Sequence, residues 1–228
     1  MKTKFSEIGR LFRLKGEVTG YEQITVGNIN ATFRVFFGAK SYIFQRVNIS
    51  VFKDPIGVMR NIDLVTTYIR EEYPEDISLH YHHTVYGDNY IIYEGEFWRV
   101  MSDFNSITID TCDSLEEIKS IGEAFGEYQR KLNGFDSSSL VETIKDFHNT
   151  KLRIDTLLNY ADEHNLKMPE IEYIRDVKDK ASKISVLYSE GKLPVRPCHN
   201  DTKANNVLLD KVTHKPLVVI DLHPIMPG

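Results

Sequence analysis

The sequence predicts an α+β fold with a β-rich first part and a mostly helical second part. Short runs of β-branched and aromatic residues, separated by glycine-containing turns, fill the first hundred positions. From Ser114 onwards, apolar residues recur at helical spacing behind helix-capping signatures. The change falls near residues 102–106, so we expect an N-terminal domain over residues 1–103 and a C-terminal domain over residues 104–228.

The N-terminal domain is predicted to be an antiparallel sheet with one helix. The sequence Asp54-Pro55 can start that helix, because Asp54 can cap the first amides and Pro55 suits the first helical position. Apolar residues then recur every three or four positions as far as Tyr73. The predicted strands are Tyr21–Val26, Ala31–Phe37, Tyr42–Val47, Leu79–Tyr86, Tyr90–Tyr93 and Phe97–Met101.

The C-terminal domain is predicted to contain three helices and two short strands. Ser114 and Glu117 form a capping box, and a second box at Ser139–Glu142 predicts another helix start. A third helix is expected from Pro169 to Glu190. The first helix should bury a stripe made of Leu115, Ile118, Ile121, Phe125 and Leu132. The two predicted strands are Val207–Leu209 and Leu217–Ile220.

Composition narrows the possible partners. The 228 residues include 28 Lys and Arg against 33 Asp and Glu, a formal net charge of −5, so neither nucleic acid nor an anionic membrane is an expected partner. Cys112 and Cys198 form no paired motif, which favours a reducing compartment. A charged N-terminus unlike a signal peptide and the absence of long apolar runs lead us to expect a cytoplasmic protein.

Several motifs with a chemical meaning are missing or incomplete. The sequence contains neither a Walker A phosphate loop nor a GxGxxG dinucleotide fingerprint. His80 and His82 would share one strand face and could hold a metal, but no third ligand stands at a suitable spacing. Solvated strand residues are therefore the preferred interpretation of these histidines.

The most informative segment spans residues 199–228. Asn206 directly precedes the apolar run 207–209, and Asp221 directly follows the run 217–220. If the runs form an antiparallel hairpin, Asn206 faces Asp221 at a Cβ separation of about 4.5–5.5 Å. Two side-chain oxygens at that distance can bind one Mg²⁺, with Asp201 beside the ion, an arrangement that suits phosphoryl transfer. The alternative is an ordinary polar loop with two unrelated acids.

The block His199-Asn-Asp-Thr-Lys-Ala-Asn-Asn206, together with Ile220-Asp221-Leu222, resembles the catalytic and metal loops of the aminoglycoside phosphotransferase and choline kinase superfamily. The run 42–48 and the terminal Met-Pro-Gly are most similar to N-acetylhexosamine 1-kinases. This resemblance implies a protein-kinase-like fold of two lobes, with ATP as co-substrate, Mg²⁺ as cofactor and a small sugar as acceptor. Residues 1–103 would be the nucleotide-binding lobe, and the oligomeric state stays open.

The resemblance also implies roles for individual residues near the end of the chain. Asp201 would be the catalytic base that takes the proton of the sugar hydroxyl, and Asn206 and Asp221 would hold magnesium. Lys203 would meet the transferring phosphoryl group or the sugar, unless it is simply a solvated loop lysine. His199 would brace the loop by hydrogen bonding.

In the N-terminal lobe the resemblance is looser. The turn at residues 26–32 would cover the phosphates with Asn30 and Thr32, although a plain hairpin turn is the alternative. Arg46 stands where kinases place a strand lysine that pairs with the phosphates. The backbone groups of Met101 and Asp103 would meet the adenine.

Two departures from the family pattern affect these expectations. His223 stands where relatives carry an acid, which puts a second set of metal ligands in doubt. The lobe of such relatives also continues well past the position of Gly228, so we expect a truncated C-terminal lobe. Open alternatives are a non-catalytic nucleotide- or sugar-binding relative and a kinase for choline, an aminoglycoside or homoserine.

Overall fold

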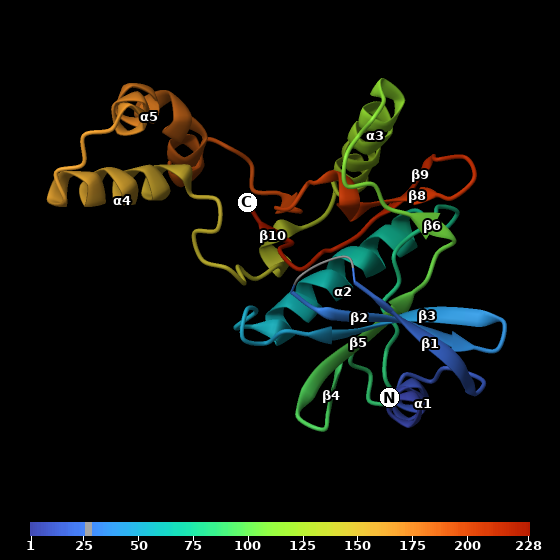
Figure 1. Ribbon diagram of the computed structural model, residues 1–228. Coiled ribbons are helices and arrows are strands. Elements are labelled where there is room, and N and C mark those ends of the chain that lie inside the picture. The colour runs from blue at the N-terminus through green and yellow to red at the C-terminus, as the bar shows by residue number, and fades with distance from the viewer. Residues whose placement is uncertain (26–28) are drawn as a thin grey trace.

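The computed structural model describes residues 1–25 and 29–228 and confirms the α+β class (Figure 1). Its first part is a five-stranded antiparallel sheet with the strand order β1-β2-β3-β5-β4. The strands are β1 (Val18–Ile24), β2 (Ala31–Phe37), β3 (Lys40–Val47), β4 (Ile91–Tyr93) and β5 (Glu96–Ser102). The turn predicted at residues 26–32 lies partly outside the described residues.

Helices cover both faces of this sheet. On one face lies α2 (Pro55–Glu72), whose first turn is capped by Asp54 as predicted. On the other face lies α1 (Lys2–Leu11), which the sequence analysis missed. Phe5 and Ile8 of α1 are fully buried against Phe44 and Trp98 of the sheet. Only this narrow apolar stripe marks α1 as a helix among its charged residues.

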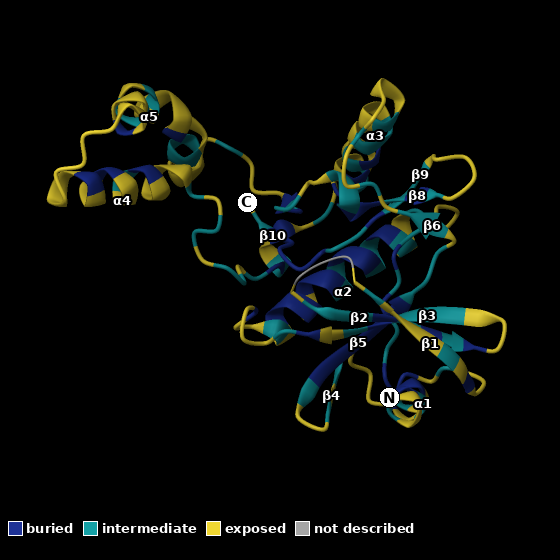
Figure 2. Cartoon of the chain, in the orientation of Figure 1, coloured by how far each residue is buried: buried dark blue, intermediate teal, exposed yellow. Residues whose placement is uncertain are grey.

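The second part contains three helices and two small sheets. Helix α3 (Leu115–Lys131) lies next to the three-stranded sheet, whereas α4 and α5 form a separate hairpin (Figure 1). The hairpin consists of α4 (Thr150–Glu163) and α5 (Pro169–Ser189). The three-stranded sheet consists of β6 (Ser106–Ile107), β8 (Val207–Asp210) and β9 (Pro216–Val219). In the second small sheet, β7 (Pro197–Cys198) pairs with β10 (Met226–Pro227). Most of the hairpin surface is exposed (Figure 2).

One apolar cluster joins the two parts. It includes Ile62 and Val65 of α2, Val207 of β8 and Leu222, none of which is more than 1% exposed. The segment that carries Asn206 and Asp221 is therefore anchored on both sides by packed core.

Two local predictions for the second part are wrong. No helix starts at Ser139, because the backbone of Val141 is held by Asn61 of α2: Val141 N donates to Asn61 Oδ1 at 3.0 Å, and Asn61 Nδ2 donates to Val141 O at 2.7 Å. The helix starts instead at Thr150. In α3, Leu115 is 84% exposed, so the first turn of the predicted stripe is not buried.

Two strand predictions also need correction. Residues 79–86 contribute only an isolated bridge between Tyr81 and Met101. In the β8–β9 hairpin, Val207 pairs with Val219 and not with Ile220, a shift of one residue from the predicted register. A bulge between Leu208 and Leu209 increases the shift to two residues, because Leu209 pairs with Pro216, which cannot donate to the ladder.

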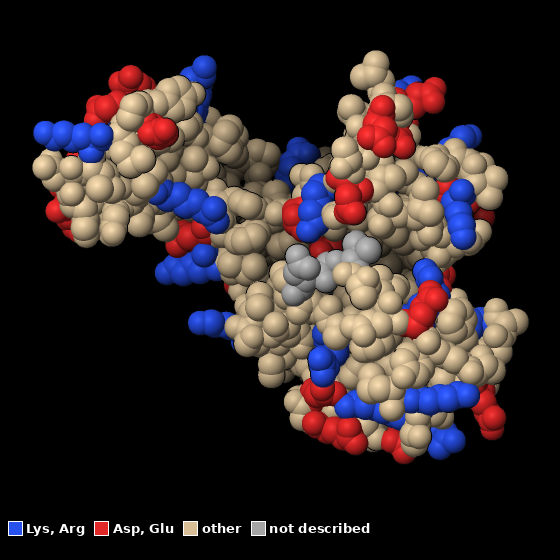
Figure 3. Space-filling view, viewed as in Figure 1, with Lys and Arg blue, Asp and Glu red and all other residues tan. Residues whose placement is uncertain are grey.

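Positive and negative side chains are interspersed over the face seen in Figure 3. Among the described residues, no helix combines the length and the apolar character needed to cross a bilayer.

Candidate active site

Asp201 and Asn206 are held together in one tight turn. Asn206 is only 3% exposed, and its Nδ2 donates at 2.8 Å to both the backbone oxygen and Oδ2 of Asp201. Lys203 Nζ lies 2.8 Å from the same Oδ2. The structure therefore brings three of the predicted site residues into direct contact and leaves Asp201 with a second oxygen, Oδ1.

His199 ties this turn to the strand that leads to Asp221. Its Nδ1 accepts from the backbone N–H of Asp201 at 3.2 Å, and its Nε2 donates to the carbonyl of Ile220 at 2.9 Å. The N–H of Ile220 in turn donates to the carbonyl of Asn206 at 2.9 Å. Because Ile220 directly precedes Asp221, these bonds fix Asp221 beside the turn that carries Asp201 and Asn206.

Asp221 has an unusual backbone and an unusual carboxylate. Its φ of 60° lies in the left-handed region, which costs a non-glycine residue roughly 1 kcal/mol. Burial raises its pKa, but the hydrogen bond from His223 and the charges of Arg99 and Lys203 outweigh burial and bring the pKa to about 2. Asp221 is therefore an anion at neutral pH.

His223 is a neutral linker between this carboxylate and the sheet. It is 2% exposed and stacked on Phe52, and burial together with the charge of Arg99 lowers its pKa to about 4. Nδ1 bonds Asp221, so the tautomer that fits leaves Nε2 to accept from Arg99 Nη2 at 2.7 Å and from Asn30 Nδ2 at 2.9 Å. Both ring nitrogens of His223 therefore take part in hydrogen bonds.

The hydrogen bonds continue across the sheet to Thr32. Gln45 of β3 accepts from Arg99 Nε at 2.9 Å through Oε1 and donates from Nε2 to Thr32 Oγ1 at 2.9 Å. Asn30 also accepts from the backbone of Asn48 at 2.9 Å. Asn30 and Thr32 therefore belong to the network that reaches Asp221.

Arg46, in contrast, is not brought to this site. Its side chain is 49% exposed and pairs with Glu96, which also binds Lys4 of α1. Side chains alternate between the faces of a strand, so Arg46 lies on the face of Phe44 and α1, while Gln45 faces Asp221. The placement of Arg46 does not fit the expected contact with phosphates.

Of the two residues expected to meet adenine, Met101 lies near the end of β5 and Asp103 directly follows the strand. Met101 is paired with Ile43 of β3 and bridged to Tyr81, so its backbone belongs to the sheet. The carboxylate of Asp103 accepts from Arg34 Nε at 2.7 Å and from Ser41 Oγ at 2.6 Å. Its side chain is therefore fixed on the sheet.

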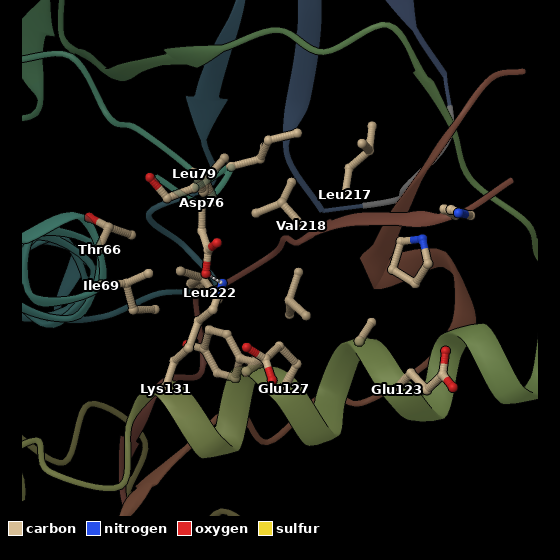
Figure 4. A pocket seen from close by; sticks show the side chains of 17 residues that line it. Thr66, Ile69, Asp76, Leu79, Glu123, Glu127, Lys131, Leu217, Val218 and Leu222 are labelled. Atoms are coloured by element: carbon tan, nitrogen blue, oxygen red, sulfur yellow. Dashed lines mark ion pairs between the residues drawn. The ribbon is translucent and has the colours of Figure 1, made fainter. Parts of the chain in front are cut away.

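One cavity lies apart from the predicted site. It measures about 450 Å³ and lies between α2, α3 and β9, with the Asp76–Lys131 ion pair at one end (Figure 4). Leu222 lines it, and none of the predicted site residues does. A second cavity, of about 340 Å³, is lined in part by Arg46 and Glu96.

The residues present fit a magnesium ion in chemical terms. Asn206 donates through its nitrogen, so its oxygen points away from that bond, and Asp221 keeps one carboxylate oxygen beyond the His223 contact. Oxygen ligands of this kind, one or two per ion, suit Mg²⁺ when phosphates complete its coordination. Among the described residues, no three or more His, Cys, Asp or Glu side chains form a cluster able to hold a metal. The histidines at positions 80, 82 and 83 therefore form no such cluster either.

Sequence reasoning missed Arg99, Gln45 and the linking role of His223. Two signals were available: strand alternation in Tyr42–Val47 separates Gln45 from Arg46, and Arg99 is a charge inside the otherwise apolar run Phe97–Met101. The contact between Arg99 and His223 spans 124 residues and has no local signature.

Comparison with solved structures places the fold. A spectinomycin phosphotransferase in complex with ADP and spectinomycin matches with a TM-score of 0.58 and 13% identity, over 99% of this chain and 69% of that chain. The GDP complex of an aminoglycoside 2'-phosphotransferase matches with a TM-score of 0.65 and 10% identity, over 99% and 72%. A Plasmodium vivax ethanolamine kinase matches with a TM-score of 0.51 and 14% identity, over 91% and 56%.

No protein-family model matches the sequence. The chain spans roughly two thirds of the length of the solved structures that it matches, for example 69% and 63%. At these identities the likeness is one of fold. This chain therefore shares the two-part, kinase-like fold of the aminoglycoside phosphotransferases and of ethanolamine kinase.

Proposed function

We propose that the chain is a nucleotide- and Mg²⁺-dependent phosphotransferase that phosphorylates a hydroxyl group of a small molecule. The observation that carries this proposal is the hydrogen-bonded block in which Asp201, Asn206 and the residue before Asp221 are joined. The block holds the side chains of Asp201 and Asn206 in direct contact and fixes the backbone that leads into Asp221. The shared fold and the family resemblance of the same residues support the assignment.

Each residue has a distinct task in this proposal. Asp201 takes the proton of the attacking hydroxyl through Oδ1, because Oδ2 is engaged by Asn206 and Lys203. Asn206 and Asp221 would hold magnesium through their side-chain oxygens, and the ion would reduce the charge on the nucleotide phosphates. Lys203, which is half exposed, stands next to Asp201 and can pair with the transferred phosphoryl group.

For the acceptor we propose the anomeric hydroxyl of an N-acetylhexosamine, on the family resemblance of the run 42–48 and the final Met-Pro-Gly. The solved structure with spectinomycin makes an aminoglycoside the first alternative to test.

The test is ADP release from Mg·ATP in the presence of N-acetylglucosamine, N-acetylgalactosamine, choline or an aminoglycoside. We expect turnover with an N-acetylhexosamine, and Asp201→Asn should lower kcat by about 10²–10⁴ while nucleotide affinity changes little. Nucleotide binding without transfer to any acceptor would instead support a non-catalytic binding protein. Near-normal turnover of Asp201→Asn would remove the base assignment.

A further inference from the structure

Arg99 is a buried charge whose contacts are unusual. Its side chain lies in the middle of β5 and is 1% exposed. Its polar contacts are Gln45 Oε1, at 2.9 and 2.5 Å, His223 Nε2 and Nδ1, at 2.7 and 3.4 Å, and Met59 Sδ, at 3.6 Å. It also lies 5.1 Å from the centre of the Tyr81 ring.

No carboxylate contacts this guanidinium among the described residues. Burying a charge costs several kcal/mol unless other groups compensate it, and breaking such a contact set is strongly destabilising. The nearest acid in its network is Asp221, one hydrogen-bonded ring away through His223. Arg99 is therefore linked to the proposed metal ligand through the ring of His223.

The position of Arg99 is also informative. Protein kinases take the cation of their phosphate site from β3, as a lysine. Here the β3 residue on the face of Asp221 is Gln45, and Arg46 points to the other face. Arg99 is the direct register partner of Gln45 on the neighbouring strand β5.

We propose that Arg99 supplies the positive charge beside the nucleotide site from β5 in place of β3, and that it acts there by positioning Asp221 through His223. This inference rests on the proposed function. Arg99 is a positioning residue in this scheme, because it is shielded from solvent by Gln45, His223 and Tyr81. Gln45 Oε1 accepts from two nitrogens of the guanidinium and fixes its position, and the ring of His223 connects the guanidinium to the carboxylate of Asp221.

The register suggests an exchange experiment. Directly paired residues on one face have Cβ atoms about 4.5–5.5 Å apart, a distance that an arginine side chain can span. The variant Gln45→Arg/Arg99→Gln moves the cation to the β3 position without changing the composition. The exchange variant is compared with the single variants Arg99→Gln and Arg46→Gln.

The measurement is the affinity for a fluorescent ATP analogue, with and without Mg²⁺, together with the melting temperature of each variant. With Mg²⁺, we expect Arg99→Gln to weaken binding about tenfold or more, and the exchange variant to recover to within about threefold of the wild type. Arg46→Gln should change the affinity by less than about twofold. The loss in Arg99→Gln should be larger with Mg²⁺ than without it, which a purely structural role would not produce.

The possible results distinguish a failure of the proposed function from a failure of the inference about Arg99. A wild-type chain that binds no nucleotide would overturn the proposed function and this inference together. A wild type that binds, with Arg46→Gln weakened and Arg99→Gln unchanged, would overturn this inference alone. If Arg99→Gln does not fold, the exchange variant decides: folding with nucleotide binding supports the proposal, and folding without binding contradicts it.

Discussion

Asp221 combines a strained backbone with a strongly stabilised charge. Its left-handed φ of 60° is retained because the preceding residue is fixed by two backbone hydrogen bonds and the following Leu222 is fully buried. His223 then fixes the carboxylate itself. A residue held by such surroundings in a sparsely populated conformation is typical of a functional position.

Replacing Asp221 by alanine should weaken the binding of Mg·nucleotide. The variant loses a carboxylate oxygen that we assign to the metal, so we expect the affinity for the nucleotide to fall by about tenfold or more in the presence of Mg²⁺. Titration calorimetry at several Mg²⁺ concentrations measures this effect. Asp179→Ala, on the exposed surface of α5, is the matched control. Unchanged Mg²⁺ dependence in Asp221→Ala would count against the metal role.

At the level of single elements, most helices and strands follow from periodicity and capping. The capping residues Asp54 and Ser114 and the proline at the first position of α5 mark real helix starts. Asn149 caps α4, whereas the similar signal at Ser139 fails because Asn61 binds the backbone of Val141. Local signals cannot report such a contact, which joins residues 80 positions apart.

The sequence predicted only the locally encoded part of the candidate site. The polar turn with Asp201 and Asn206 is close in sequence and was recognised from its motif. The exact register of the hairpin was not, because the pairing is shifted by one residue at Val207 and by two at Leu209, on the two sides of a bulge. The choice of Arg99 over Arg46 depends on which strand face meets Asp221, and that becomes visible only in three dimensions.

Glu96 makes the attachment of α1 to the sheet sensitive to pH. Hydrogen bonds from Lys4 and Arg46 lower its pKa from 4.5 to about 2, outweighing the effect of its burial. A lowered pKa stabilises the folded state above pH 4.5, and this contribution is lost as the pH falls from about 4.5 to about 2.

The variant Glu96→Gln should therefore lose stability at neutral pH and show a flatter dependence of stability on pH between these values. Urea unfolding from pH 6 down to about pH 3 measures it, with Glu71→Gln, exposed on α2, as the control. A wild type and a Glu96→Gln variant with parallel profiles would show that Glu96 contributes nothing in this window.

At the scale of the whole molecule, the α4–α5 hairpin stands apart from the rest (Figure 1). Its small apolar cluster consists of Ile154, Leu158, Ala161, Ile171 and the partly buried Ile174. The total accessible area of 13621 Å² exceeds the about 10,600 Å² expected for a compact monomer of this size.

We expect the hairpin to open before the rest of the molecule. Helices with few buried contacts exchange their amide hydrogens through local opening, at a lower free energy than global unfolding. Hydrogen exchange followed by mass spectrometry should show peptides of α4 and α5 exchanging faster than buried peptides of α2. Equal protection of α2 and α5 would contradict this expectation.

The central claim is that Asn206 and Asp221 bind one magnesium ion next to Asp201. A crystal structure with Mg²⁺ and a non-hydrolysable ATP analogue tests it most directly. We predict an ion about 2.0–2.1 Å from one oxygen of Asn206 and one of Asp221, with the terminal phosphate facing Asp201. A nucleotide bound elsewhere, or an ion that touches neither residue, would contradict the account.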